Sequence, residues 1–270
     1  MSSHTRRRRL EPLTQRFKRV LTRIRGGFHK KQRVYVLDLH NARVKHIVVA
    51  DSFLASEIAE NLTRLRSTNV FPELLAQHRN ELWVEFVEGE AVGVGPDTPV
   101  RDLAHLFSTL YGVEATTVAC QDRTFAAEIL RDIDFLRNAG VISAEVAAGL
   151  ITVCHRSTPT DVWVGYDYGD ARPGNFLLDR ENRIRIIDVE SIRRDTLIGI
   201  GVARACSRWP GLTRESFLAA LREQRAPDFM AYFDFVELYF RTTWTKRCVL
   251  LEKTKLIDPV ALERLAGIMK

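Results

Sequence analysis

Cysteine is scarce in this chain, with four residues (Cys120, Cys154, Cys206 and Cys248) spread over 270 positions. None of them forms a closely spaced C-x-x-C pair, which excludes a disulfide scaffold and a thiolate zinc site. No uninterrupted apolar run approaches the roughly eighteen residues of a membrane-spanning helix. The first residues also lack the apolar core of a signal peptide. We therefore expect a cytoplasmic enzyme or binding domain.

Acidic residues are nearly missing from one end of the chain. Residues 1–31 contain 11 Lys and Arg against a single acid, Glu11, a balance of +10. The other 239 residues contain 29 Lys and Arg against 33 Asp and Glu, a balance of −4. The net charge of +6 is therefore a property of the N-terminal arm and not of the whole surface.

The arm, residues 1–29, also has a helical pattern. Apolar residues recur at steps of three and four, with arginines between them: Leu10, Leu13, Phe17, Val20, Leu21, Ile24 and Phe28. A basic amphipathic helix of this kind binds an anionic membrane surface. It can equally be a first helix that packs its apolar stripe on the body of the protein. A transit peptide and a nucleic-acid-binding arm are weaker alternatives, because the charges are not regularly interleaved with aromatic residues for base stacking.

The remaining chain changes character at a segment rich in Gly and Pro, residues 89–99, which we expect to be a linker. Before it, alternating patterns predict strands at 33–39, 44–50, 74–77 and 82–87, with one helix from Ser52 to about Ser67. After it, helical patterns predominate, at 100–111, 122–138, 143–154, 213–223 and 229–252. One β-rich segment, residues 162–189, interrupts them. The sequence thus predicts an α+β protein with a small β-rich lobe (30–90) and a larger, mostly helical lobe (91–270).

The β-rich segment 162–189 contains the residues most suited to chemistry. Asp170 and Asn175 lie at the two ends of a tight turn, and Asp188 ends the next strand. Oxygen ligands of this kind suit a hard cation such as Mg²⁺, and a free carboxylate can orient a hydroxyl group. Each residue alone also fits an ordinary turn, in which Asp and Asn accept hydrogen bonds from the backbone. We favour a site because the three residues form an ordered set.

Residues 170–175 read D-A-R-P-G-N, with the Asp-to-Asn spacing of the kinase catalytic loop H-R-D-x-x-x-x-N. This segment resembles the protein-kinase-like phosphotransferase superfamily. It is most similar to the H-G-D-x-H-P-G-N form of the aminoglycoside phosphotransferase and bacterial lipopolysaccharide-core sugar kinase branches. The segment Ile186–Glu190 is similar to their metal-binding I-D-F-E. The resemblance implies a two-lobed kinase-like fold, a site between the lobes, and the cofactors ATP and Mg²⁺.

The resemblance also implies roles for particular residues. Asp170 would be the catalytic base or hydroxyl-orienting group, and Asn175 and Asp188 would hold magnesium. Arg172 would lie near the transferred phosphate and offset its developing charge.

In the small lobe, Lys45 would bind ATP phosphates and Glu57, rather than Glu60, would position it. Lys45 is also explained as an exposed lysine early in its strand. The segment from Glu85 to Val87 would be the hinge whose backbone meets the adenine.

Three features depart from the family pattern. No G-x-G-x-x-G precedes the first strands, and the histidine two residues before the catalytic aspartate is Tyr168 here. The D-L-A aspartate that braces the catalytic loop in relatives is also missing, and Gly201-Val202-Ala203 stands in that region. We interpret Gly199-x-Gly201 as a closely packed helix start.

The implied function is Mg-ATP-dependent phosphorylation of a hydroxyl on a sugar or other small molecule. The basic arm favours a glycolipid acceptor, such as a lipopolysaccharide core, with the protein at the cytoplasmic face of the inner membrane. Two alternatives stay open. One is a pseudokinase that binds nucleotide or a partner without phosphoryl transfer, motivated by Tyr168 and the missing glycine loop. The other is a nucleic-acid-binding adaptor that uses the arm.

Overall fold

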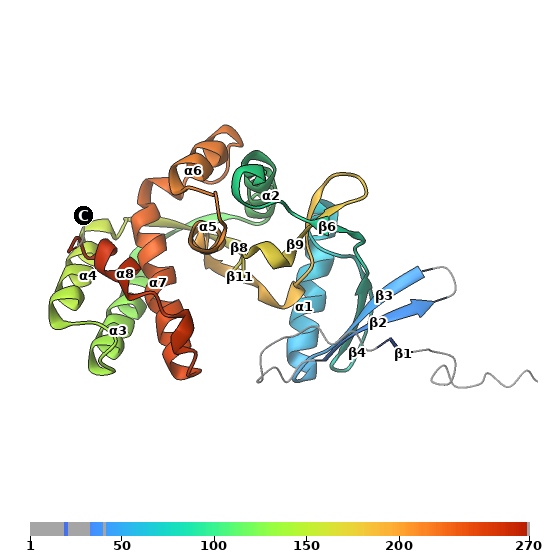
Figure 1. Ribbon diagram of the computed structural model, residues 1–270, viewed down its shortest axis with the longest axis horizontal. Helices are drawn as coiled ribbons and strands as arrows, with labels where there is room; N and C mark the ends of the chain where they lie inside the picture. The colour runs from blue at the N-terminus through green and yellow to red at the C-terminus, as the bar shows by residue number, and fades with distance from the viewer. Residues whose placement is uncertain (1–18, 21–32, 40–41, 269–270) are drawn as a thin grey trace, which may run out of the picture. The chain divides into compact units, whose positions relative to one another are not determined.

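The computed structural model describes residues 19–20, 33–39 and 42–268, and the chain divides into two compact units between Glu88 and Gly89 (Figure 1). The first unit is built on one antiparallel sheet of order β1-β2-β3-β5-β4. Its strands are β1 (Arg19–Val20), β2 (Arg33–Leu39), β3 (Ala42–Val48), β4 (Leu74–His78) and β5 (Glu81–Glu85).

Helix α1 (Ser52–Arg64) packs against β4 and β5 of this sheet. It begins where Asp51 accepts a hydrogen bond of 2.9 Å from the backbone N–H of Leu54, as expected of an N-cap. Its apolar stripe, which includes Ile58 and Leu62, is buried, and so are Leu82 and Val84 of β5. Burial of these side chains away from water stabilises the unit. The four predicted strands and the single helix of this unit are confirmed.

The predicted helical arm lies outside the described residues, except for Arg19 and Val20. These two residues form β1, which pairs antiparallel with Leu37 and Val36 of β2. The helix prediction is therefore wrong at these two positions. Their backbone groups form hydrogen bonds with the edge strand of the sheet instead of the hydrogen bonds of a helix.

Two small antiparallel sheets lie in the second unit. One has the order β10-β9-β6, from β10 (Ile184–Ile186), β9 (Phe176–Asp179) and β6 (Gly89–Ala91). The other has the order β11-β8-β7, from β11 (Ile192–Leu197), β8 (Asp161–Tyr168) and β7 (Thr116–Ala119). The predicted linker 89–99 is wrong at its start, because residues 89–91 pair with β9 and so belong to a sheet.

Helices make up the rest of the second unit: α2 (Val100–Tyr111), α3 (Phe125–Asn138), α4 (Ala144–Ser157), α5 (Ile200–Arg208), α6 (Arg214–Glu223), α7 (Phe233–Leu250) and α8 (Pro259–Leu265). The aromatic-rich α7 packs against α3, α4 and α5, and its rings Phe233, Phe235 and Phe240 are buried. The five predicted helices are confirmed with shifted ends. Of the other two, α5 was expected only as a helix start at Gly199-x-Gly201, and α8 was not predicted. Among the described residues, no helix combines the length and the apolar character that crossing a membrane would require.

An aromatic cluster lies at the centre of the second unit. Phe176, which is fully buried, meets Trp209 edge-on at 5.0 Å between ring centroids and Tyr168 at 6.0 Å. Phe107 of α2 lies 6.4 Å from the same ring. Because Phe176 directly follows Asn175, the packing of this ring fixes the backbone at the end of the 170–175 loop.

We expect Phe176→Ala to lower the free energy of unfolding by about 3–5 kcal/mol, because it leaves a cavity among packed rings. Phe53, which is 79% exposed, supplies the matched control. Phe53→Ala should change the unfolding free energy by less than about 0.5 kcal/mol. Urea unfolding of the three proteins measures both values, and equal values for the two variants would contradict this account of the core.

Candidate active site

The β9–β10 hairpin brings two of the predicted site residues to one end of a sheet. Phe176 at the start of β9 pairs with Ile186 at the end of β10, so Asn175 and Asp188 flank the same end. The backbone N–H of Ile187 donates a 2.9 Å hydrogen bond to the carbonyl of Asn175. Antiparallel pairing alone therefore places a residue that precedes one strand beside a residue that follows the next.

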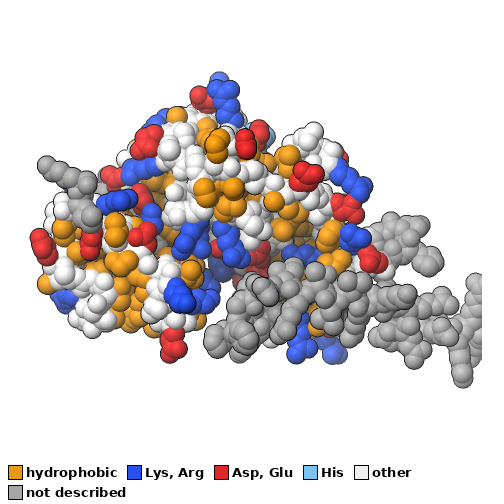
Figure 2. Space-filling view, in the orientation of Figure 1, with side chains coloured by type: hydrophobic (Ala, Val, Ile, Leu, Met, Phe, Trp, Pro, Cys, Tyr) orange, Lys and Arg blue, Asp and Glu red, His pale blue; other side chains and the backbone are white. Residues whose placement is uncertain are grey.

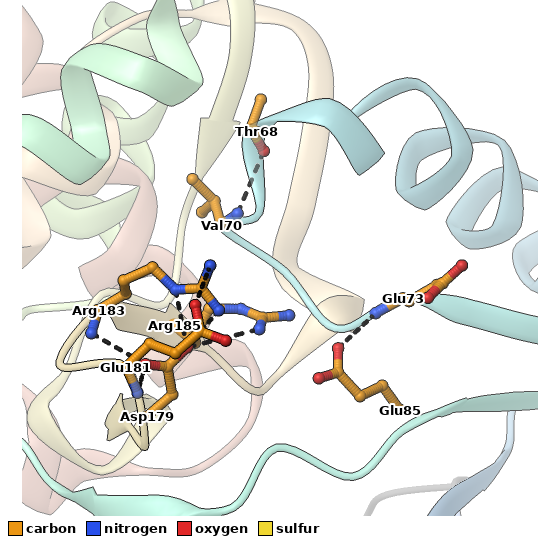
Figure 3. Close-up of polar contacts among 8 residues, drawn as sticks. All are labelled: Thr68, Val70, Glu73, Glu85, Asp179, Glu181, Arg183 and Arg185. Carbon is orange, nitrogen blue, oxygen red and sulfur yellow. Dashed lines mark hydrogen bonds and ion pairs between the residues drawn. The ribbon is translucent and has the colours of Figure 1, made fainter.

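Asp179 holds the opposite end of this hairpin, as Figure 3 shows. Its carboxylate accepts hydrogen bonds from the backbone N–H groups of Glu181 and Arg183, both 2.9 Å, and from the Arg183 guanidinium. Burial alone would raise the pKa of Asp179, but these hydrogen bonds outweigh it and lower the pKa. The turn is thereby fixed, and with it the register that sets Asn175 beside Asp188.

The side-chain amide of Asn175 joins the loop together. Its Nδ2 donates to the carbonyl of Asp170 at 2.8 Å, to Asp170 Oδ2 at 3.0 Å and to the Tyr168 hydroxyl at 2.9 Å. Three acceptors around one atom identify it as the nitrogen of the amide. Asn175 Oδ1 accepts no hydrogen bond from any described residue, so this oxygen is available to a ligand.

Asp188 follows β10 at the end of the hairpin where Asn175 precedes β9. Burial raises the pKa of the Tyr168 hydroxyl strongly, and the charges of Asp188 and Asp170 raise it further. Within the described ranges, the Asp188 carboxylate has no hydrogen bond or ion pair. Asn175 therefore lies beside both Asp170 and Asp188, and one amide oxygen and one carboxylate of this group receive no hydrogen bond from the described residues.

The available oxygens of Asn175 and Asp188 fit magnesium, which is commonly held by one or two protein oxygen ligands together with phosphates and water. They do not form a protein-only cage. No group of three or more His, Cys, Asp or Glu side chains that could hold a metal occurs in the part of the chain that the structure describes.

Two arginines bind the Asp170 carboxylate from different sides. Arg172, from the loop itself, places Nε 3.1 Å from Oδ2 and is half exposed. Arg204 of α5 places Nη2 3.3 Å from Oδ1, and its side chain is 5% exposed. Burial lowers the pKa of Arg204, and the neighbouring Asp170 partly opposes this effect. The sequence pointed to Arg172 alone, because nothing in the local pattern marks Arg204 as a neighbour of the loop.

Asp167 is a second residue that the sequence analysis missed. Its carboxylate is almost fully buried and accepts hydrogen bonds from the backbone N–H groups of Gly199 (2.9 Å), Gly201 (3.1 Å) and Tyr168 (2.6 Å), and from the Tyr111 hydroxyl (3.1 Å). These bonds tie the start of α5 to the end of β8, beside the loop. Asp167 thus braces the region from the strand side. An acid inside the apolar run of β8 was the available signal.

Gly201 is required by this contact. A Cβ atom there would lie 2.5 Å from the carbonyl oxygen of Tyr168 and 2.6 Å from Asp167 Oδ1, which is too close for any side chain. The interpretation of Gly199-x-Gly201 as a closely packed helix start is confirmed.

The first unit holds the residues predicted to bind nucleotide. Lys45 lies in β3 opposite Val84 of β5. Glu57 is exposed on α1 and makes no ion pair among the described residues, so Lys45 and Glu57 are not paired. Glu60 instead pairs with Arg64 at 2.9 Å.

At the end of β5, Glu85 is tied to Glu73. Its carboxylate accepts a 3.1 Å hydrogen bond from the Glu73 N–H, drawn in Figure 3, and its own N–H donates to the Glu73 carbonyl. Val87, two residues further along, is buried.

Several solved structures share this fold. A macrolide 2'-phosphotransferase from Brachybacterium faecium is 12% identical, with 88% of each chain covered and a TM-score of 0.59. Choline kinase from Streptococcus pneumoniae is 14% identical, with 90% of each chain covered and a TM-score of 0.59. A thermostable mutant of an aminoglycoside phosphotransferase, in complex with ADP and hygromycin B, is 12% identical over 93% of this chain and 92% of that one, with a TM-score of 0.61.

No protein-family model matches the sequence, and no curated protein sequence matches it. The fold nevertheless is that of the protein-kinase-like phosphotransferases, which confirms the α+β, two-lobed fold class implied by the catalytic-loop resemblance.

The Asp167 carboxylate should make stability depend on pH. Burial raises its pKa to about 6, against the hydrogen bonds that lower it. Between about pH 4 and pH 6 the folded protein then keeps a proton that the unfolded chain has lost, so stability falls as pH rises, and the loss is complete above about pH 6. We expect the unfolding free energy of the wild type, relative to Asp167→Asn, to fall by about 3 kcal/mol across this window.

Urea unfolding at a series of pH values measures this difference. Asp161→Asn, at the exposed far end of β8, is the control, and its difference from the wild type should stay constant. A pH-independent difference for Asp167→Asn would show that the buried group does not titrate in this range.

Proposed function

We propose that the protein is a Mg-ATP-dependent phosphotransferase acting on a hydroxyl group of a small molecule. The observation that carries the proposal is the convergence of Asp170, Asn175 and Asp188 at one end of the β9–β10 hairpin. The solved structures of similar fold, named as macrolide and aminoglycoside phosphotransferases and as choline kinases, support the same class of reaction.

Asp170 is suited to orient the acceptor hydroxyl. A carboxylate can accept about four hydrogen bonds. Three donors are present, with Arg204 on Oδ1 and both Arg172 and Asn175 on Oδ2. Oδ1 therefore keeps room for one further donor, the hydroxyl of an acceptor. The two arginines fix the carboxylate in place, so little reorganisation is needed when that hydroxyl binds.

In the proposed reaction, the acceptor oxygen forms a bond to the γ-phosphorus of ATP while the bond from that phosphorus to the β–γ bridging oxygen breaks. The products are a phosphate ester and ADP, and the hydroxyl proton passes to Asp170 and then to solvent. Asn175 Oδ1 and the Asp188 carboxylate would hold Mg²⁺, which supplies positive charge to the phosphates when bound. Arg172, half exposed beside Asp170, would offset charge on the transferred group.

The proposed nucleotide contacts lie in the first unit. Lys45 would bind phosphate oxygens, and the backbone from Glu85 to Val87 would meet the adenine. The role expected of Glu57 is not part of the proposal, because Glu57 is exposed and is not paired with Lys45. Lys45 lies in a regular strand, which fixes its backbone position, and its ammonium group is a compact positive charge suited to phosphate oxygens.

The pseudokinase alternative rests on Tyr168 and the missing glycine loop. Tyr168 makes the hydrogen bond to Asn175 described above, so it supports the loop as the family histidine would. We therefore favour an active enzyme over a pseudokinase.

Turnover of Mg-ATP by site variants tests the proposal. With a crude extract of small molecules and glycolipids as the source of acceptor, we expect ADP formation to fall at least about 100-fold in Asp170→Asn, because the hydroxyl-orienting group is lost. Asp188→Ala should abolish it by removing a metal ligand. Asp161→Asn, on the exposed start of β8, should retain wild-type turnover.

Nucleotide binding without turnover in the wild type would favour the pseudokinase. Turnover that persists in both Asp170→Asn and Asp188→Ala would refute the assigned site.

The finer proposal is that the acceptor is a glycolipid reached at a membrane surface through the basic arm. The charge of residues 1–31, +10, supports this choice because clustered Lys and Arg are attracted to anionic lipid. Deletion of residues 1–25 should remove binding to liposomes that contain anionic lipid and leave turnover of a soluble acceptor intact. Co-sedimentation measures this, and unchanged binding after the deletion would rule the membrane role out.

A further inference from the structure

A small pocket lies between α5 and α7, within the second unit. It has a volume of about 40 Å³ and is bounded by Arg204 and Arg208 of α5, Arg241 and Trp244 of α7, and Leu256 and Asp258 after α7. We refer to it as the α5–α7 pocket. A volume of this size has room for about three water-sized groups. In the view of Figure 2, basic side chains gather on the face formed by these two helices.

Three residues that line this pocket, Arg204, Arg241 and Trp244, have buried N–H donors without partners. Arg204 Nε and Nη1, Arg241 Nε and Trp244 Nε1 are all buried, and none has a hydrogen-bond acceptor in the described part of the chain. Natural proteins satisfy nearly all such groups, because a buried donor without an acceptor costs free energy. Four of them around one pocket indicate that an acceptor group from outside the chain completes it.

The charge of the α5–α7 pocket specifies what kind of acceptor group this is. Three arginines line it against a single acid, Asp258, which is 60% exposed and 4.0 Å from Arg241. The nearby Glu237 is already engaged by Arg214 and Arg241. Arg204 is also paired with Asp170, so Arg208 is the lining arginine without a carboxylate partner among the described residues. Its unpaired positive charge makes the pocket favour an anion.

The orientation of the Arg204 guanidinium indicates which shape of anion the pocket prefers. Its guanidinium stacks on the Trp244 ring, 3.7 Å from the centroid. A guanidinium held by its flat face presents its N–H groups along its edge, the arrangement that binds phosphate or carboxylate oxygens in pairs. One edge atom, Nη2, already contacts Asp170, while Nε and Nη1 are the unpartnered atoms of the α5–α7 pocket.

We propose that the α5–α7 pocket binds an oxyanion, a phosphate or carboxylate group, carried by the acceptor molecule. The inference rests on the proposed function, because Arg204 links the pocket directly to Asp170. An acceptor bound in this way has its anionic group against Arg204, Arg208 and Arg241 and its hydroxyl near Asp170. A cationic acceptor such as choline is disfavoured at these arginines.

Binding of two simple anions tests the pocket independently of catalysis. Inorganic phosphate and acetate are titrated into the full chain by calorimetry, and the comparison distinguishes a phosphate site from a carboxylate site. We expect Arg208→Gln and Arg241→Gln each to weaken binding of the preferred anion about tenfold, the effect of one charge-assisted hydrogen bond. Arg137→Gln, which removes an exposed arginine paired with Asp134 on α3, should leave it unchanged.

Asp188→Ala separates failure of the pocket from failure of the proposed function. Asp188 does not line the pocket, so this variant should bind the anion as the wild type does while losing Mg-ATP turnover. Anion binding in a wild type without turnover would refute the proposed function and leave the pocket assigned. Anion binding that is absent, or unaffected by both Arg208→Gln and Arg241→Gln, would overturn the pocket.

Acceptor preference supplies a second readout. ADP formation is compared for glucosamine, glucuronate and glucose 6-phosphate at equal concentrations. We expect one of the two anionic sugars to exceed glucosamine, and Arg241→Gln to raise KM for it about tenfold with little change in kcat, as loss of uniform binding does. Faster turnover of glucosamine would overturn the proposal. If none of the three sugars is turned over, the anion titration alone decides.

Discussion

The buried carboxylate of Asp167 is the contact on which the arrangement of the site depends. It accepts hydrogen bonds from the start of α5, from the backbone of Tyr168 and from Tyr111 of α2, and so joins three elements that are distant in sequence. Desolvating a carboxylate is costly, and the donors around it offset that cost only while all three elements keep their places. Once α5 is fixed, Arg204 is carried to Asp170, and the loop acquires a partner that its own sequence does not contain.

Local contacts then arrange the rest of the site. The β9–β10 hairpin sets Asn175 beside Asp188, the Asn175 amide draws Asp170 and Tyr168 together, and two arginines hold the Asp170 carboxylate. The hydrogen-bond donors of the protein leave three acceptors available to ligands: Asn175 Oδ1, the Asp188 carboxylate and one lone pair of Asp170. This is the pattern expected where the protein positions reactants and neutralises charge rather than forming covalent bonds.

The sequence predicted correctly those features that depend on interactions between residues close together in the chain. The strands β2 to β5, the β-rich character of residues 162–189, α1 and five later helices follow from periodicity and turn chemistry, which act over a few residues. The same local patterns marked Asp170, Asn175 and Asp188 as candidates. Arg204 and Asp167 could not be placed in this way, because their roles arise from packing between α5, β8 and the loop. The strand at 89–91 was mistaken for linker since its partner, β9, lies almost ninety residues further along the chain. Pairing over such distances has no signature in a short window of sequence.

Metal-dependent nucleotide binding tests the central claim, that the hairpin assembles an oxygen-ligand site for a cation and phosphates. Electron paramagnetic resonance with Mn²⁺ as the substitute ion reports free and bound metal directly, in the presence and absence of ADP. The account predicts that the wild type and Asp161→Asn bind Mn²⁺ together with ADP, whereas Asp188→Ala and Asn175→Ala lose the bound signal. Equal Mn²⁺ and ADP binding in all four proteins would contradict it.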